Sequence, residues 1–404
     1  MYKRQGKLLE IHDASEDRVT PPCVYYQKCG GCQLQHMTYR AQLDMKREQV
    51  VNLFHRKAGF DSTTIHDTIG METPWHYRNK SQIPVGKNKA QETVMGFYRQ
   101  RSHDIIDMDE CLIQDDIHNE VMNKVRDWLN ELQVSIYNER KKKGIVRHVV
   151  IRAGHHTGEL MVIFVTNGRK LKQSQTLVDR LVATFPNITS IKQNINQTHS
   201  NVIMGDESVT LYGKDQIEDT LSDVRFKISD QSFYQINTSQ TEKLYQKAID
   251  YAALSGEETV LDTYCGIGTI GLYMAPQAKH VYGVEVVPEA ITDAKENATI
   301  NGYQNTTFVC GKAEEVILDW QSNGIKPDVV MVDPPRKGCD ETFLDTLLAL
   351  KPQKIIYISC NPSTQQRDAL RLSSNYDLVQ ITPVDMFPHT THVETVAQFI
   401  RKDV

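Results

Sequence analysis

Short β-branched runs alternate with helical patterns through the last part of the chain, from about Phe226 onward. Helices are expected to begin near Thr269 and after Pro288. Strands that alternate with helices form a parallel, doubly wound sheet, whose ligands bind beyond the carboxyl ends of the strands. The pattern therefore predicts an α/β, Rossmann-like domain at 226–404 with one ligand crevice. The expected strands are 259–262, 280–285, 307–310, 328–332, 354–359 and 393–400.

The regions before this domain have a different pattern. Two alternating runs at 145–153 and 159–166, joined by a short glycine-bounded turn, predict a β-hairpin. We therefore expect a central α+β domain at 116–225. Residues 21–115 hold a cysteine-rich segment and a helix expected at 38–57. The apolar face of that helix is expected to contain Leu43, Val50 and Phe54.

The composition is that of a globular protein, with 404 residues, 40% hydrophobic and 24% charged. No run approaches the ~18 apolar residues of a membrane span, and the first ten residues lack a secretory signal. We therefore expect a cytoplasmic protein, and a monomer by default. Eight cysteines are too few for a secreted disulfide scaffold of this length. Clustered cysteines in a reducing compartment indicate a metal or cluster site instead.

A glycine-bearing turn follows the first strand of the C-terminal domain. Gly266 and Gly268 separate this strand from the next helix, where the absence of side chains lets a ligand approach the backbone. The spacing differs from the G-x-G-x-x-G pattern of dinucleotide sites. Glu285 ends the next strand, where it can accept hydrogen bonds from ribose hydroxyls. These features favour an adenosine ligand without a pyrophosphate.

Two further motifs lie at the carboxyl ends of later strands. In Val332-Asp-Pro-Pro-Arg-Lys-Gly338 two prolines fix an extended backbone at the rim of the crevice. Ile358-Ser-Cys-Asn-Pro362 places Cys360 at a strand end, where its thiolate can attack a carbon of a bound ligand; a structural cysteine is the alternative. Glu394, His389 and His392 are candidate general bases. We favour Glu394 because it opens the final strand beside the crevice.

Together these motifs resemble the RNA uridine C5-methyltransferase family. The resemblance implies transfer of a methyl group from S-adenosylmethionine to C5 of a uridine, with Cys360 adding to C6 and Glu394 removing the C5 proton. It makes Cys265, a rival thiol, a turn residue. The residues implied to bind S-adenosylmethionine are Gln235, Tyr264, Glu285 and Asp333. The matching segments, in family order, are Phe233–Asn237, Asp262–Gly271, Asp333–Gly338, Ser359–Pro362 and His392–Glu394.

Four cysteines near the front form a separate motif. Cys23, Cys29, Cys32 and the distant Cys111 offer four thiolates, which on spacing alone can hold zinc or an iron–sulfur cluster. This part is similar to the ribosomal branch of the family, whose members carry a [4Fe–4S] cluster on such cysteines, whereas the transfer-RNA branch typically lacks them. The resemblance therefore implies 23S ribosomal RNA as substrate. A structural role is expected for the cluster, because this methyl transfer needs no electron donor.

Two further expectations concern RNA binding. Many ribosomal members begin with a small β-barrel domain, of which residues 1–20, with a strand at 6–12, are expected to be a remnant. From Trp75 to His103, six Lys or Arg stand against one acidic residue, although the net charge of the chain is −5. Aromatic residues interleave with them, and such a stretch can stack on bases and contact phosphates. We expect it to face RNA; an ordinary exposed hairpin is the alternative.

Other functions remain open on the sequence. Transfer RNA is an alternative substrate, and cytidine C5 methylation also proceeds by cysteine addition. A protein of another class, an iron–sulfur RNA-binding protein that senses redox conditions, would not need Cys360.

Overall fold

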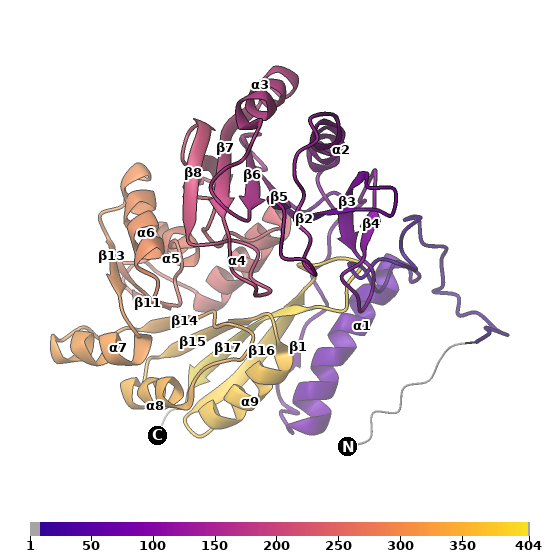
Figure 1. Cartoon of the computed structure of the whole chain (residues 1–404). Helices are drawn as coiled ribbons and strands as arrows, with labels where there is room; N and C mark the ends of the chain where they lie inside the picture. The colour runs from indigo at the N-terminus through magenta and orange to yellow at the C-terminus, as the bar shows by residue number, and fades with distance from the viewer. Residues whose placement is uncertain (1–8, 403–404) are drawn as a thin grey trace.

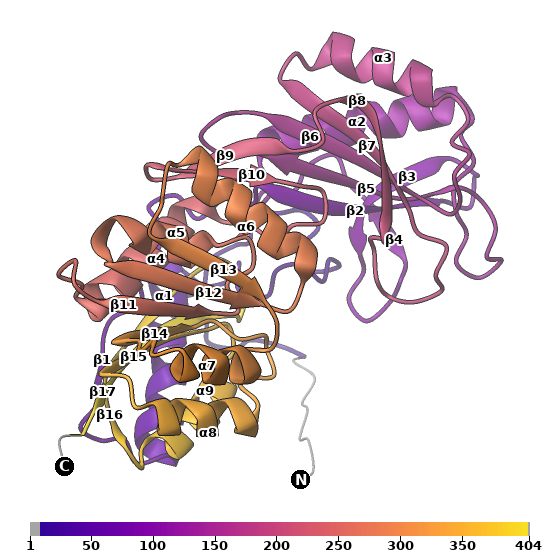
Figure 2. The ribbon, with the colours of Figure 1, turned by 90° about the vertical axis from the view of Figure 1, so that its left-hand side faces the viewer.

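Two separate β-sheets organise the chain. The computed structural model describes residues 9–402. An eight-stranded sheet is built mainly from the C-terminal half, and a seven-stranded sheet from residues 80–213. Figure 2 shows the two sheets in different lobes, with a two-stranded ribbon between them. The ribbon consists of β9 (Ile217–Leu221) and β10 (Val224–Ile228).

The C-terminal sheet is doubly wound, as the alternating pattern predicts. Its strand order is β1-β16-β17-β15-β14-β11-β12-β13, and only β17 runs antiparallel to its neighbours (Figure 1). The strands are β1 Thr64–Ile65, β11 Thr259–Thr263, β12 His280–Glu285, β13 Thr306–Cys310, β14 Val329–Val332, β15 Lys354–Ser359, β16 Tyr376–Val384 and β17 Glu394–Arg401.

Helices cover both faces of this sheet because side chains alternate along its buried strands. Ile356 and Ile358 of β15 belong to the same apolar cluster as α4, α5 and α6. Ile355 and Tyr357 belong to the cluster formed with α1, α7, α8 and α9. The helices are α1 Tyr39–Val51, α4 Thr238–Ala252, α5 Thr269–Met274, α6 Pro288–Ile300, α7 Ala313–Ser322, α8 Glu341–Leu350 and α9 Pro362–Leu372, and a 3-10 turn, Ala275–Gln277, follows α5.

The central sheet has the order β4-β3-β2-β5-β6-β7-β8. The predicted hairpin is present as β5 and β6, and α2 and α3 pack on the side away from the C-terminal lobe (Figure 2). The elements are β2 Lys80–Lys87, β3 Thr93–Tyr98, β4 Ile105–Asp107, α2 Asp116–Glu131, β5 Val146–Ala153, β6 Leu160–Thr166, α3 Ser174–Thr184, β7 Ile188–Ile195 and β8 Glu207–Gly213.

The front of the chain does not form one separate unit. β2, β3 and β4 belong to the central sheet, so a boundary at residue 115 divides that sheet. α1 and β1 belong to the C-terminal lobe, where Thr64 and Ile65 pair in parallel with Gln380 and Ile381. β1 thereby covers part of the edge of β16, which would otherwise expose unpaired backbone groups.

The helix expected at 38–57 is α1 followed by a π-helical turn, Asn52–Lys57. Thr38 caps its start by accepting a hydrogen bond from the Ala41 amide. Val50 and Phe54 are buried as predicted, but Gln42 and Lys46 are fully buried too. The apolar pattern did not reveal these two polar positions.

Part of the expected N-terminal strand at 6–12 lies outside the described residues, and Leu9–His12 are not in a strand. Within residues 9–402, no helix combines the length and apolar character required to cross a bilayer.

Candidate active site

The carboxyl ends of five strands, β11 to β15, open into one cavity of about 1000 Å³, here called the strand-end cavity. It lies where a doubly wound sheet binds its ligands. All six residues predicted to bind a cofactor or act chemically line it, although they come from distant parts of the chain. They are Gln235, Tyr264, Glu285, Asp333, Cys360 and Glu394.

The glycine turn after β11 forms one wall of the cavity. Gly266 and Gly268 have φ of +54° and +82°, a conformation that favours glycine. Glu285 is fixed beside the turn, because its carboxylate accepts hydrogen bonds from the amides of Gly266 (3.3 Å), Val286 (2.7 Å) and Val287 (3.1 Å). The arrangement presents backbone and a carboxylate to the same space, as an adenosine ligand requires.

Asp262 supports this turn through a backbone hydrogen bond. The sequence motifs did not identify it as a functional residue. Its Oδ2 accepts a hydrogen bond from the Gly271 amide at 2.8 Å, and the side chain is fully buried. Burial raises its pKa to about 8. The position of Asp262 near the end of β11, four residues before Gly266, is the sequence feature that could have identified it.

Cys360 follows β15 directly and is held by a short turn. The Asn361 amide donates to Ser359 Oγ (3.1 Å), and Asn361 Nδ2 donates to the Arg336 carbonyl oxygen (3.0 Å). The thiol is only partly buried. Burial raises its pKa, the carboxyls of Glu394 and Asp333 raise it further, and Arg336 opposes them. An accessible thiol therefore lies among charges that control its ionisation.

Cys265, the rival thiol, also lines the cavity but is only 4% exposed. Burial raises its pKa well above the ordinary value, and Asp262 and Glu285 add to this effect. These surroundings oppose formation of a thiolate at Cys265.

Glu394 begins β17 and is 4% exposed. Burial raises its pKa to about 8, the negative charge of Asp333 adds to the effect, and Arg336 opposes it. Burial also raises the pKa of Asp333 to about 7. Perturbed carboxyls that face a thiol in a cleft are typical of proton-transfer sites.

The two histidines named as alternative bases differ in position. His392 lines the strand-end cavity, whereas His389 is not among the residues that line it. His389 is 3% exposed and stacks on Trp75 with ring centroids 3.7 Å apart. Burial lowers the pKa of His389 to about 4, so its imidazole is neutral at pH 7. The geometry therefore favours Glu394 or His392 over His389.

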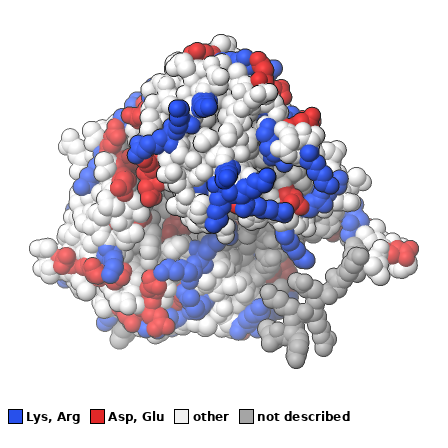
Figure 3. Space-filling view, viewed as in Figure 1, with Lys and Arg blue, Asp and Glu red and all other residues white. Residues whose placement is uncertain are grey.

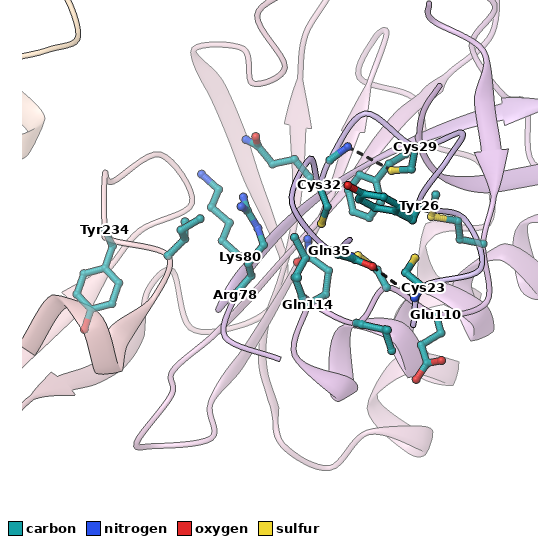
Figure 4. Close-up of a pocket in the computed structure, with 18 of the residues that line it drawn as sticks. Cys23, Tyr26, Cys29, Cys32, Gln35, Arg78, Lys80, Glu110, Gln114 and Tyr234 are labelled. Atoms are coloured by element: carbon teal, nitrogen blue, oxygen red, sulfur yellow. Dashed lines mark hydrogen bonds between the residues drawn. The ribbon is translucent and has the colours of Figure 1, made fainter. Parts of the chain in front are cut away.

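The four front cysteines line a second cavity, of about 330 Å³, here called the cysteine cavity (Figure 4). Burial raises the pKa of Cys32 to about 12 and that of Cys111 to about 11, and the neighbouring cysteines add to both shifts. The four thiols are thus close enough for the charge of one to raise the pKa of another. Among residues 9–402, however, no three His, Cys, Asp or Glu side chains are arranged to hold a single metal ion.

One loop separates the two cavities. Phe233, Tyr234 and Ile236 line both the cysteine cavity and the strand-end cavity, and Arg78 and Lys80 lie between the cysteines and Tyr234 in Figure 4. Phe233 is 73% exposed, an unusual position for a large apolar side chain.

The basic stretch expected to face RNA is only partly exposed. Tyr77 is 5% exposed and donates a hydrogen bond to the Pro388 carbonyl oxygen, while Trp75 stacks on His389. These two aromatic rings are therefore structural. Lys and Arg side chains gather across the middle of the face seen in Figure 3. A hollow of about 910 Å³ on the central domain is lined by five basic residues, Lys87, Lys89, Arg99, Arg140 and Arg147, and by three acidic ones, Asp104, Asp107 and Glu139.

Comparison with known proteins gives consistent results. The chain is 73% identical over 398 residues to an uncharacterized RNA methyltransferase of Staphylococcus epidermidis, covering 98% of this chain and 87% of that protein. It is 70% identical over 394 residues to one of Staphylococcus aureus, with the same coverage.

A solved structure is also similar. The tRNA (uracil-54, C5)-methyltransferase of Pyrococcus abyssi, in complex with S-adenosyl-L-homocysteine, shares 31% identity and a TM-score of 0.78. The match covers 97% of this chain and 88% of that one. The α/β methyltransferase fold and dependence on S-adenosylmethionine are thus supported beyond the motifs. Residues 38–402 match the tRNA (uracil-5-)-methyltransferase family. This chain is therefore a member of that family of S-adenosylmethionine-dependent RNA methyltransferases.

Proposed function

We propose that this protein, acting as a monomer, transfers a methyl group from S-adenosylmethionine to C5 of a uridine in 23S ribosomal RNA. The observation that carries the proposal is the convergence of Cys360, Glu394 and the glycine turn on one strand-end cavity. A thiol, a carboxyl with a raised pKa and an adenosine-type site are the three elements that this reaction needs.

In the proposed reaction the Cys360 thiolate forms a bond to C6 of the uracil ring, and the C5–C6 π electrons pass into an enolate. C5 then attacks the methyl carbon of S-adenosylmethionine, whose carbon–sulfur bond breaks to leave S-adenosylhomocysteine. Glu394 takes the C5 proton, the C5–C6 double bond re-forms, and the thiolate leaves C6. The uridine must be unstacked to reach Cys360.

Four residues are proposed to hold S-adenosylmethionine. Glu285, fixed at the glycine turn, accepts hydrogen bonds from the ribose hydroxyls, and Tyr264 lies at the other side of the turn. Gln235 and Asp333 approach from the loop after β10 and from the end of β14. The charge of Asp333 also raises the pKa of Cys360.

We propose that Cys23, Cys29, Cys32 and Cys111 bind a [4Fe–4S] cluster. The fit rests on four thiols around a single cavity. A bound cluster would favour the thiolate forms and hold segments 23–32 and 111 together.

The choice of 23S RNA rests on the cysteine motif, and the RNA is proposed to cross the basic hollow lined by Lys87, Lys89 and Arg147. Transfer RNA is the second candidate, favoured by the 31% identity to the tRNA (uracil-54, C5)-methyltransferase of Pyrococcus abyssi.

Tritium release from RNA labelled at uridine C5 tests the proposal. Wild type should release tritium from 23S transcripts, whereas Cys360→Ala should release none and still bind S-adenosylmethionine. Cys310→Ala, which removes an exposed thiol, is the matched control and should remain active. Release from tRNA alone would retain the chemistry and change the substrate. Full activity of Cys360→Ala would refute the mechanism.

A further inference from the structure

The loop at 385–393, which joins β16 to β17, leads directly into Glu394. Its Phe387 and His392 line the strand-end cavity with Glu394. Glu394 itself pairs with Val384 across β16 and β17, so the loop begins and ends beside Glu394 and forms part of its surroundings. Much of what holds this loop comes from the front of the chain rather than from the C-terminal sheet.

His389 is the most constrained residue of this loop. Its carbonyl oxygen accepts hydrogen bonds from the amides of Gln33 (2.8 Å) and Leu34 (2.9 Å), which directly follow Cys32. Its amide donates to Gln42 Oε1 at 3.0 Å, and Gln42 Nε2 lies 3.2 Å from its Nδ1. Gln42 is fully buried, so both contacts are shielded from water.

The neighbouring residues are held in the same way. Tyr77 Oη donates to the Pro388 carbonyl oxygen at 3.1 Å, and Lys46 Nζ donates to the Phe387 carbonyl oxygen at 3.2 Å. The carbonyl groups of three consecutive residues, 387–389, thus accept hydrogen bonds from residues between Gln33 and Tyr77.

The backbone of His389 indicates that these contacts impose its conformation. Its φ of +66° is left-handed, which is unfavourable for a residue other than glycine. Such conformations persist where surrounding contacts determine them, and they concentrate at functional sites. His389 does not line the strand-end cavity, so a direct chemical role does not explain them.

We infer that Gln42, together with the Gln33–Leu34 amides and Tyr77, is a positioning element for Glu394 that links the cysteine segment to proton removal. The inference rests on the proposed function. Because Gln33 and Leu34 follow Cys32, a displacement of Cys32 is transmitted to His389 through two backbone hydrogen bonds.

The test measures two products in one reaction: tritium released from C5-labelled RNA, and the protein–RNA adduct that survives denaturation. Gln42→Leu removes both contacts with His389 at similar size. It should slow tritium release about 10- to 100-fold, because displacement of a catalytic group by about 1 Å has effects of this order. Adduct should accumulate, since Cys360 addition precedes the slowed step, and S-adenosylmethionine affinity should not change.

Tyr77→Phe removes one hydroxyl and provides a milder variant if Gln42→Leu does not fold. It should slow release about 3- to 10-fold, the effect of one hydrogen bond, and also accumulate adduct. Asp44→Ala, on the exposed face of α1, is the control and should match wild type.

Wild-type release and adduct levels in both Gln42→Leu and Tyr77→Phe would overturn the inference alone. A parallel loss of adduct, release and S-adenosylmethionine binding in these variants would also overturn it, because it would indicate general damage. Absence of release and of a Cys360-dependent adduct in wild type would overturn the proposed function, and this inference with it.

Discussion

The ion pair between Lys46 of α1 and Asp385 gives a quantitative test of how the front of the chain is attached to the C-terminal lobe. Lys46 Nζ lies 2.5 Å from Asp385 Oδ1, both side chains are fully buried, and Tyr39 Oη donates to Asp385 Oδ2 at 2.9 Å. Burial lowers the pKa of Lys46 and raises that of Asp385, so loss of water opposes both charges.

The distance sets the size of the attraction. At an effective dielectric constant of about 20, two unit charges at this separation attract by about 7 kcal/mol. Removing each charge from water costs several kcal/mol, so the pair contributes little compared with apolar side chains of the same size. Removal of one partner leaves a buried, unpaired charge, which lowers the free energy of unfolding by about 3–5 kcal/mol.

We therefore expect Lys46→Met to destabilise the C-terminal lobe by about 3–5 kcal/mol, and Lys46→Met with Asp385→Leu to recover most of this loss. Urea unfolding followed by circular dichroism measures the change. The relevant transition is the one that S-adenosylmethionine shifts to higher urea, because the ligand protects this lobe. A loss below about 1 kcal/mol in Lys46→Met, or no recovery in the double variant, would refute this account of the pair.

Three further predictions concern the sites. Glu394 and Cys360 must both be deprotonated to react, and burial raises both pKa values, that of Glu394 to about 8. Tritium release should therefore rise with pH through 8 and beyond, and a rate independent of pH between 6 and 8 would contradict the assignment of these two groups. Glu285→Gln should weaken S-adenosylmethionine binding about 10-fold by calorimetry, whereas the exposed Glu289→Gln should not; equal affinities would reassign the ribose contact. Anaerobically purified protein should contain iron and absorb broadly in the visible, Cys111→Ser should lose both, and stoichiometric zinc alone would contradict the cluster.

The strand-end residues could be predicted from the sequence because each follows a short apolar strand. In a doubly wound sheet all such positions lie at one edge, so local patterns alone bring Glu285, Asp333 and Cys360 together. The predicted strand at 354–359 coincides with β15, and that at 280–285 with β12.

The buried polar contacts of α1 could not be predicted in this way. Gln42 and Lys46 look like exposed positions of an amphipathic helix, and the groups that satisfy them, His389 and Asp385, are more than 300 residues away. Tyr77 was expected to face RNA because it stands among basic residues, but its hydroxyl is bound to the Pro388 carbonyl oxygen. Long-range partners determine burial at these positions.

The pairing of β1 with β16 has a consequence for synthesis of the chain. Thr64 pairs with Gln380, and Lys46 with Asp385, 339 residues later. The central sheet, built from residues 80–213, can form during translation, since domains generally fold as units as they emerge. α1 is synthesised long before β16 and β17. Lys46 therefore stays without its partner Asp385 until the last strands have been synthesised. A chain that stops before Asp385 should therefore leave α1 undocked, as a target for proteases or chaperones.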